Sequence, residues 1–195
     1  MRRVHRGDGL ELTIDTAFDT ASIALGASIA CSGVCLTAVA TEPGAFTVQV
    51  SPETVSRSTL GDWTEGTPVN LEGSLRLGDE LGGHLVLGHV DGVVRILDRR
   101  PQAESVRFAF AAPQALARYI APKGAIALDG VSLTVNEVTD EGSSCRFGVN
   151  IIPHTLAHTG FGTAMPGQRM NLEIDPIARY VARLLETRTH EGSLR

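Results

Sequence analysis

Cysteine is scarce in this sequence, because its 195 residues contain only Cys31, Cys35 and Cys145. The number is odd, no CxxC pair occurs, and no His/Cys spacing matches a zinc site. A disulfide framework and a structural zinc centre are therefore not indicated. Unpaired cysteines are typical of a reducing compartment, so we expect a cytoplasmic protein.

Clustered positive charge is also lacking. The 22 Asp and Glu residues outnumber the 17 Lys and Arg residues, which gives a net charge of -5. The basic residues form no cluster larger than pairs such as Arg2-Arg3 and Arg99-Arg100. Nucleic-acid-binding domains normally carry a basic face, so no nucleic-acid partner is expected.

Signals for export or membrane insertion are weak. The N-terminus has no basic region followed by an apolar run and a cleavage site, so we expect no signal peptide. Residues Thr20–Thr41 form a run of 22 uncharged residues, which is long enough to raise the question of a membrane span. The run contains two glycines and many Ser and Thr, and the matching stretch later in the chain carries Lys123, Asp129 and Glu137. We interpret it as part of a soluble domain and expect no membrane partner.

The sequence does contain an internal repeat. The stretch Gly33–Thr37 (GVCLT) returns 97 residues later as Gly130–Thr134 (GVSLT). Two further landmarks follow in the same order, PET at 52–54 against PHT at 153–155, and NLE at 70–72 against NLE at 171–173. Chance similarity is the alternative, but the shared order of three landmarks favours two tandem domains of about 90–100 residues.

Short strands dominate the expected secondary structure. Apolar and polar residues alternate in two sets of segments, at 10–14, 46–50 and 69–71 in the first copy and at 106–110, 131–135, 147–151 and 170–174 in the second. Gly and Pro interrupt the chain about every ten residues. This pattern indicates all-β barrels or sandwiches rather than an alternating α/β chain.

Three helices are expected among these strands. Residues 112–120 have helical spacing and residues 18–25 are a weaker counterpart, and each would plug or cap a barrel. At the C-terminal end, Asp175 can cap a helix that Pro176 begins. Its apolar stripe follows at Ile177, Tyr180, Val181, Leu184 and Leu185. Packing of this stripe on its own domain and packing on another subunit are both open.

The first copy is shorter at its start than the second. The second copy opens with residues 82–90 before a strand at 93–97, whereas the first begins at Met1 with only the region that matches the end of that strand. Either the first barrel lacks its opening strand or the natural start lies upstream of Met1. We favour the second, because a barrel without one strand exposes unpaired edges.

Several polar side chains could carry chemistry. Cys35 and Ser132 occupy the same place in the repeat, either as a matched pair of ligand-contacting groups or as ordinary small buried residues. His84 and His89 flank an apolar run and are either structural or able to exchange protons near neutral pH.

Other candidates depend more on context. Thr37 and Thr134 offer hydroxyl donors in matching positions, although Thr is also a good strand former. The amides of 49–54 and 150–155 could bond the edge of a planar heterocycle. Asp175 is most simply a helix cap, with a catalytic or ligand-binding role as the alternative. The copies differ where Lys123 and Asp129 replace Gly26 and Ser32, which predicts a pseudo-symmetric site with unlike halves.

Four motifs, in order along the chain, resemble the α-chain type of riboflavin synthase. They are residues 29–37 (IACSGVCLT), 82–90 (GGHLVLGHV), 126–134 (IALDGVSLT) and 171–176 (NLEIDP). The resemblance covers essentially the whole chain. It implies an all-β fold of two tandem pseudo-symmetric six-stranded Greek-key barrels, at 1–80 and 81–175, with the first barrel N-terminally incomplete. A trimerisation helix and tail would follow at 176–195.

The resemblance also implies an activity. In that family two molecules of 6,7-dimethyl-8-ribityllumazine exchange a four-carbon unit and give riboflavin and 5-amino-6-(D-ribitylamino)uracil, without a cofactor or metal. Family members are homotrimers whose active site forms between the first barrel of one subunit and the second barrel of its neighbour. Lumazine synthase is a further candidate partner. The family's opening strand, of Met-Phe-Thr-Gly type, contacts substrate and is lacking here, which leaves the activity of this form to experiment.

By the same resemblance we expect the following site. His89 would transfer protons, Cys35 and Ser132 would activate or trap the substrate C7, and Asp175 would be a polar or acid–base helper. The barrel-one half-site would contain Ser28, Cys35, Leu36, Thr37, Gln49, Val50, Ser51, Pro52, Glu53, Thr54, Gly88, His89 and Val90, with Lys123 from a neighbouring subunit. The barrel-two half-site would contain Ser132, Leu133, Thr134, Asn150, Ile151, Ile152, Pro153, His154 and Thr155.

Two rival functions fit the same features less well. A non-catalytic lumazine- or flavin-binding protein usually keeps one binding half-site, whereas both half-sites here retain their Cys35/Thr37 and Ser132/Thr134 groups. A flavin-dependent reductase domain would need a nucleotide-binding α/β partner, and no Gly-rich strand-to-helix fingerprint follows. The sequence therefore favours the enzyme.

Overall fold

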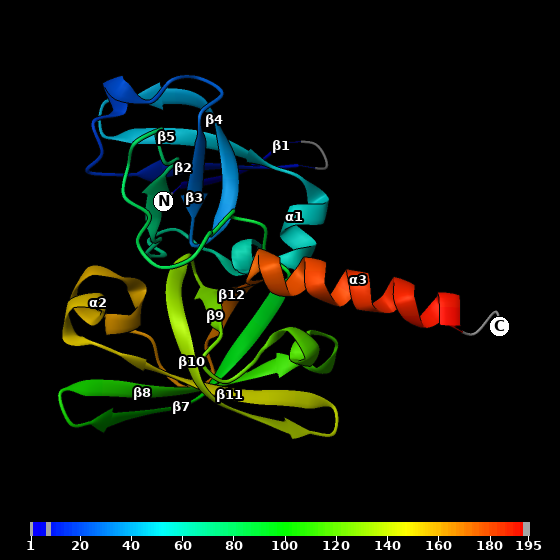
Figure 1. The fold of residues 1–195 in the computed structure, drawn as a ribbon. Coiled ribbons are helices and arrows are strands. Elements are labelled where there is room, and N and C mark those ends of the chain that lie inside the picture. Colours follow the sequence, from blue (N-terminus) through cyan, green and yellow to red (C-terminus); the bar gives the residue numbers. More distant parts are fainter. Residues whose placement is uncertain (1, 7–8, 193–195) are drawn as a thin grey trace.

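The chain folds into two β-structures, one after the other, and a C-terminal helix. This computed structural model describes residues 2–6 and 9–192. Figure 1 shows the first β-structure above the second, with helix α3 projecting to one side. The fold is thus mainly β, as the period-two patterns predict.

The first β-structure is a six-stranded antiparallel sheet in the order β1-β2-β5-β4-β3-β6. Its strands are β1 (Arg2–Arg6), β2 (Gly9–Asp15), β3 (Ser28–Cys31), β4 (Val34–Glu42), β5 (Ala45–Val50) and β6 (Leu71–Gly73). Inward-facing residues such as Leu12, Phe46 and Val48 are fully buried, while Glu11, Thr13, Thr47 and Gln49 between them are partly or fully exposed. This sheet is barrel one below.

The second β-structure is a closed six-stranded barrel in the order β10-β11-β8-β7-β12-β9. Its strands are β7 (Gly92–Gln102), β8 (Ser105–Pro113), β9 (Ala125–Leu128), β10 (Val131–Glu141), β11 (Ser144–Ile151) and β12 (Arg169–Ile174). Its core includes Phe108, which stacks on Phe110 and meets Phe161 edge to face. This is barrel two below.

The first strands of the two copies differ in length. β7 pairs with β12 through Gly92–Arg95 and with β8 from Arg95 onward. Arg3 of β1 pairs with Leu12, and Arg99, in the second half of β7, pairs with Phe108, which is the counterpart of Leu12 in the second repeat. Strand β1 therefore corresponds only to the second half of β7. Within the described residues β1 forms no ladder with β6, and barrel one is open at this seam. The comparison of the copies predicts this shortfall.

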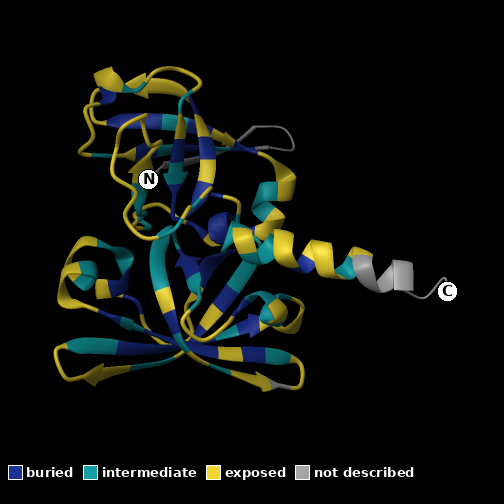
Figure 2. Ribbon diagram, viewed as in Figure 1, coloured by how far each residue is buried: buried dark blue, intermediate teal, exposed yellow. Residues whose placement is uncertain are grey.

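The C-terminal helix α3 (Pro176–Gly192) begins where the sequence predicts. The Ile177 N–H donates to Asp175 Oδ1 at 2.8 Å, which confirms Asp175 as the cap. Arg179 and Glu186 face barrel two, where Arg179 pairs with Asp91 and Glu186 pairs with Arg118. The apolar stripe is exposed, with Ile177 and Tyr180 each 69% accessible, as the yellow segments of α3 in Figure 2 show. The stripe therefore does not pack on its own domain.

The shorter helices differ from the prediction. The helices expected at 18–25 and 112–120 are the 3₁₀ turns η1 (Thr20–Ser22) and η3 (Gln114–Tyr119). The second begins later than predicted because β8 continues to Pro113 and Ala112 is buried opposite Cys145. Four helical segments are not predicted, namely α1 (Pro52–Arg57), η2 (Thr59–Asp62), α2 (Pro153–His158) and η4 (Gly160–Gly162).

The two repeats meet at a joint with approximate two-fold symmetry. The side-chain amide of Asn70 reaches into the second repeat, and that of Asn171, its counterpart, reaches into the first. Asn70 Nδ2 donates to Asp129 O at 3.0 Å and Asn171 Nδ2 donates to Ser32 O at 2.9 Å. Their Oδ1 atoms accept from Gly160 N at 2.8 Å and Thr59 N at 2.7 Å. The third landmark of the repeat thus fixes one barrel to the other.

The described helices include none that has both the length and the apolar composition needed to cross a bilayer.

Candidate functional site

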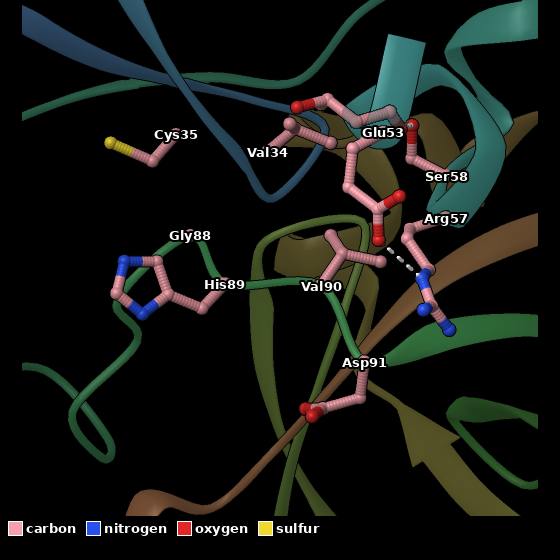
Figure 3. A pocket seen from close by; sticks show the side chains of 10 residues that line it. Val34, Cys35, Glu53, Arg57, Ser58, Gly88, His89, Val90 and Asp91 are labelled. Atoms are coloured by element: carbon pink, nitrogen blue, oxygen red, sulfur yellow. Dashed lines mark hydrogen bonds and ion pairs between the residues drawn. The ribbon is translucent and has the colours of Figure 1, made fainter. Parts of the chain in front are cut away.

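A hollow of about 430 Å³ lies between barrel one and the linker that leads to barrel two. We call it the Cys35 hollow. Figure 3 shows Cys35 and His89 on one side of it and the Glu53–Arg57 pair on the other. Its lining residues are Val34, Cys35, Glu53, Thr54, Arg57, Ser58, Gly88, His89, Val90 and Asp91.

The alternation of strand β4 directs Cys35 outward. Val34 and Leu36 are buried in barrel one, whereas Cys35 and Thr37 are exposed. In the ladder with β3, Cys35 pairs with Ala30 and Thr37 pairs with Ser28. Directly opposed residues share one face of a sheet, so Ser28, Cys35 and Thr37 line the same outer face.

Gly88 brings the linker against this face. Its carbonyl accepts the Cys35 N–H at 2.9 Å, and its φ of +76° lies in the left-handed region that favours glycine. A Cβ on Gly88 would come within 2.6 Å of the Cys35 Cβ. Only glycine allows this approach, and it places the next residue, His89, beside Cys35 (Figure 3).

Helix α1 forms the opposite wall. Ser51 Oγ accepts the Thr54 N–H at 3.1 Å and so caps the helix that Pro52 begins. Glu53 and Arg57 form an exposed ion pair at 2.9 Å one helical turn apart. The Thr54 amide, one of those expected to bond a ligand, is thus used by the helix cap, while the Glu53 and Arg57 side chains face the hollow.

Asp91 closes the hollow toward helix α3. Its carboxylate pairs with Arg179 at 2.8 Å and accepts the Ile174 N–H at 2.9 Å. Like Val34, Arg57 and Ser58, which also line the hollow, this residue is not among those predicted from the sequence. Only Arg57 gave a usable signal, through its i,i+4 spacing from Glu53.

The equivalent position in barrel two holds a different pair. Ser132 Oγ lies 2.7 Å from His84 Nδ1 and accepts the His84 N–H at 3.3 Å. Burial lowers the pKa of His84, although the charges of Asp175 and Glu173 act in the opposite direction. A neutral imidazole at this distance can accept the Ser132 proton. The sequence named both residues but not their contact.

The remaining barrel-two candidates lie apart from the Cys35 hollow. Asn150 Oδ1 accepts from Arg107 at 3.2 Å, and Arg107 also pairs with Glu137. His154 stacks on His158 with ring centroids 4.1 Å apart. The Lys123 side chain is exposed, and its backbone φ lies in the left-handed region. The other predicted members on this side are Leu133, Thr134, Ile151, Ile152, Pro153 and Thr155.

The hollow thus unites some predicted residues and not others. Six of them line it, namely Cys35, Glu53, Thr54, Gly88, His89 and Val90. Leu36 and Val50 have their side chains in the core, so only their backbone can face a ligand. Ser28, Thr37, Gln49, Ser51 and Pro52 are exposed outside its lining. Asp175 caps α3 and acts electrostatically on His84 rather than lining the hollow.

The three cysteines differ in character. Burial, with a smaller contribution from Cys35, raises the pKa of Cys31 to about 12. Burial also raises the pKa of Cys145. Cys35 alone of the three is exposed, so it is the thiol that a ligand in the hollow can meet. Among the described residues no group of three His, Cys, Asp or Glu side chains is placed to hold a metal ion.

Comparison with known proteins gives consistent relatives. The lumazine binding domain family matches residues 1–74 and 87–175. The chain is 49% identical over 184 residues to the riboflavin synthase of Brucella abortus, covering 92% of this chain and 89% of the relative. It is 44% identical to that of Mycobacterium bovis (92% and 90% covered) and 36% identical to that of Bacillus subtilis (92% and 81%).

Solved structures agree on the fold. A crystal structure of LumP complexed with riboflavin superposes with a TM-score of 0.80 at 21% identity, covering 89% of this chain and 92% of that chain. A complex of LumP with 6,7-dimethyl-8-(1'-D-ribityl) lumazine gives a TM-score of 0.77 at 20% identity, covering 88% and 91%.

Proposed function

The chain belongs to the riboflavin synthase family and is an enzyme of that family, and from this premise we propose how its two barrels perform the reaction. Two molecules of 6,7-dimethyl-8-ribityllumazine react, and a four-carbon unit passes from one to the other. The products are riboflavin and 5-amino-6-(D-ribitylamino)uracil. Residues 1–80 and 81–175 form the two lumazine-binding domains, and 176–195 form the assembly helix and tail.

The observation that carries this proposal is the Cys35 hollow. Its lining comes only from residues 34–58 and 88–91, and a volume of about 430 Å³ suits one drug-sized molecule. The reaction needs two lumazines, so the second must bind on a different surface. The matching surface in barrel two, around Ser132 and His84, is the half-site for it.

Opposed binding of two identical molecules supplies much of the rate enhancement through proximity and orientation. The C7 methyl of a lumazine is acidic because its anion delocalises into the ring, so a modest base suffices. His89, beside Cys35, transfers protons to and from the substrate. Cys35 and Ser132 activate or trap C7 of their respective substrates: as Ser132 Oγ forms a bond to C7, its proton passes to His84. Asp175 acts as an acidic neighbour of His84.

The two half-sites come together between subunits. The exposed stripe of α3 supports a homotrimer, because exposed apolar surface of this kind marks a protein interface. In the trimer, barrel one of one subunit faces barrel two of its neighbour, which brings Lys123 to the Cys35 hollow. A cytoplasmic location follows from the unpaired thiols, and lumazine synthase is a candidate partner.

The enzymatic test uses the full chain and 6,7-dimethyl-8-ribityllumazine. We expect lumazine absorbance to fall and riboflavin fluorescence to rise, with two lumazines consumed for each riboflavin. Cys35→Ala, measured alongside at equal folded concentration, should be slower. Lumazine that is bound but not consumed would instead support a non-catalytic binding protein.

Assembly is tested by sedimentation of the same protein. The parent chain should sediment at three times its 20.6 kDa mass. Leu184→Glu, on the exposed stripe, should dissociate it, whereas Arg183→Gln on the polar side of α3 should not. A parent chain that sediments as a monomer would contradict the trimer.

A further inference from the structure

Glu173, on strand β12, is a buried carboxylate with an unusual set of partners. It is only 2% accessible, and buried carboxylates require strong hydrogen bonds or a counter-charge. Its oxygens accept three consecutive backbone N–H groups, from Leu87 at 2.7 Å, Gly88 at 2.9 Å and His89 at 3.1 Å. These residues lie at least 84 positions away in the chain.

Three successive N–H groups that converge on one point form an anion-binding concavity. Here the left-handed Gly88, with φ +76°, turns the backbone so that its neighbours' amides point the same way. The anion in this concavity is the protein's own carboxylate. Glu173 therefore fixes the backbone of the linker at the residues that bear the His89 side chain.

The same linker segment is held from the other side by barrel one. The Cys35 N–H donates to Gly88 O at 2.9 Å. Gly88 therefore connects a carboxylate of barrel two to the reactive face of barrel one. Any displacement of Leu87–His89 from Glu173 would move His89 relative to Cys35.

The strand register explains why this residue can reach the linker. Ala127 of β9 pairs with Ser132 on one side and with Glu173 on the other. Directly opposed residues share a face, so Ser132 and Glu173 lie on one face with a small residue between them. The linker crosses this face, where His84 contacts Ser132 and the Leu87–His89 backbone contacts Glu173.

We propose that Glu173 is a positioning residue for the reaction: its carboxylate orders the Leu87–His89 backbone and so holds the His89 imidazole at the Cys35 hollow. Glu173 does not line the hollow and does not touch the substrate. This inference rests on the proposed function, since it assumes that the hollow is where lumazine reacts.

Two substitutions separate positioning from packing. Glu173→Gln keeps the volume but replaces one acceptor oxygen by an NH₂ group that faces backbone donors. Glu173→Asp keeps two acceptor oxygens but leaves space behind a shorter side chain. Positioning predicts that kcat is lower in Glu173→Gln than in Glu173→Asp, whereas a purely packing role predicts the reverse. Glu104→Gln makes the same charge change at an exposed turn of the same barrel and is the matched control.

The kinetic experiment measures kcat and KM of the full-length variants at a temperature where circular dichroism shows all of them folded. We expect Glu173→Gln to lose about 10- to 100-fold in kcat, the size of effect that follows from displacing a catalytic group by about 1 Å. KM should change less than kcat. Parent-like kcat in Glu173→Gln, or a lower kcat in Glu173→Asp than in Glu173→Gln, would overturn the inference.

Hydrogen exchange supplies a readout that does not need substrate. The amides of Leu87, Gly88 and His89 should exchange slowly in the parent and in Glu104→Gln, and faster in Glu173→Gln. Unchanged exchange in Glu173→Gln would overturn the inference. If the parent binds lumazine without consuming it, the proposed function fails, and lumazine affinity decides the inference: weaker binding by Glu173→Gln supports it, and equal binding overturns it.

Discussion

Gly33 and Gly130, which hold the same position in the two repeats, touch each other across the joint between the barrels. A Cβ on Gly33 would lie 2.6 Å from the Gly130 nitrogen, and a Cβ on Gly130 would lie 3.0 Å from the Gly33 nitrogen. Both have φ near +80°, at +76° and +82°. The repeated GV turn therefore serves first as the contact between the two domains, and Cys35 and Ser132 follow it two residues later.

Gly33→Ala should destabilise the chain through this contact. The left-handed backbone costs an alanine about 1–2 kcal/mol, and overpacking at a backbone contact adds about 1–3 kcal/mol. Gly44→Ala is the control, because Gly44 has φ +78° but nothing within 4 Å of its Cβ position. Urea unfolding of both variants measures the difference. Equal losses would mean that the two glycines are not in tight contact.

Asp129→Asn should remove a pH dependence of stability. Burial raises the pKa of Asp129 to about 7, against the hydrogen bond from Asn171 N. A raised pKa means that the folded state favours the protonated form, so this contribution to stability is complete below about pH 4 and is lost as the pH rises through 7. Each pKa unit corresponds to about 1.4 kcal/mol.

The measurement for Asp129 is the free energy of unfolding between pH 4 and pH 8. The variant should match the parent near pH 4 and exceed it by about 4 kcal/mol at pH 8. Asp98→Asn, which changes a carboxylate that is 44% accessible, is the control. Its free energy of unfolding should vary with pH as that of the parent does. A parallel curve for Asp129→Asn as well would show that Asp129 does not titrate in this range.

Gly88→Ala should impair the reaction more than it impairs folding. A side chain at this position meets Cys35 at 2.6–2.9 Å, so the linker must move away and carry His89 with it. We expect about a 100-fold loss in kcat/KM. Gly78→Ala, in the same linker at φ +99° with open space around it, should keep near-parent activity. If the two variants were equally active, the close contact of Gly88 with Cys35 would not be needed for catalysis.

Cys35 should be the single fast-reacting thiol of the native protein. It is exposed, whereas Cys31 and Cys145 are buried with raised pKa values. Ellman's reagent should give one fast equivalent, absent in Cys35→Ser, and riboflavin or the lumazine should slow this phase. A rate unaffected by either ligand would place the ligand outside the Cys35 hollow.

Many of the strands and their two-fold repetition could be predicted from the sequence because side-chain alternation in a barrel depends on neighbours along the chain. Strands β3, β4 and β9 were not predicted. Helices α1 and α2 could not be predicted from periodicity, since six residues are too few. The Ser51-Pro52 cap would have been the signal for α1. The C-terminal helix was correctly predicted from its cap and its stripe, and its exposed face was left open.

The candidate site was harder to predict. Cys35 and His89 were placed in one half-site only through the family resemblance, because their proximity depends on the path of the linker over Gly88. The contact of His84 with Ser132 depends on the same path. Glu173 was noted only as a landmark of the repeat, because its partners are backbone amides, which carry no sequence signal. Asp91 likewise owes its place to an ion pair with a helix that begins 85 residues later.

The Gly88–His89 segment is held by Cys35 from one domain and by Glu173 from the other, so the wall of the hollow exists only when both domains are folded. A ligand bound there favours the fully folded chain over any species in which either barrel has opened. Because the linker contacts both domains, it couples the folding of one barrel to the folding of the other. Lumazine binding should raise the unfolding temperature of barrel two even though the hollow contains no strand of it.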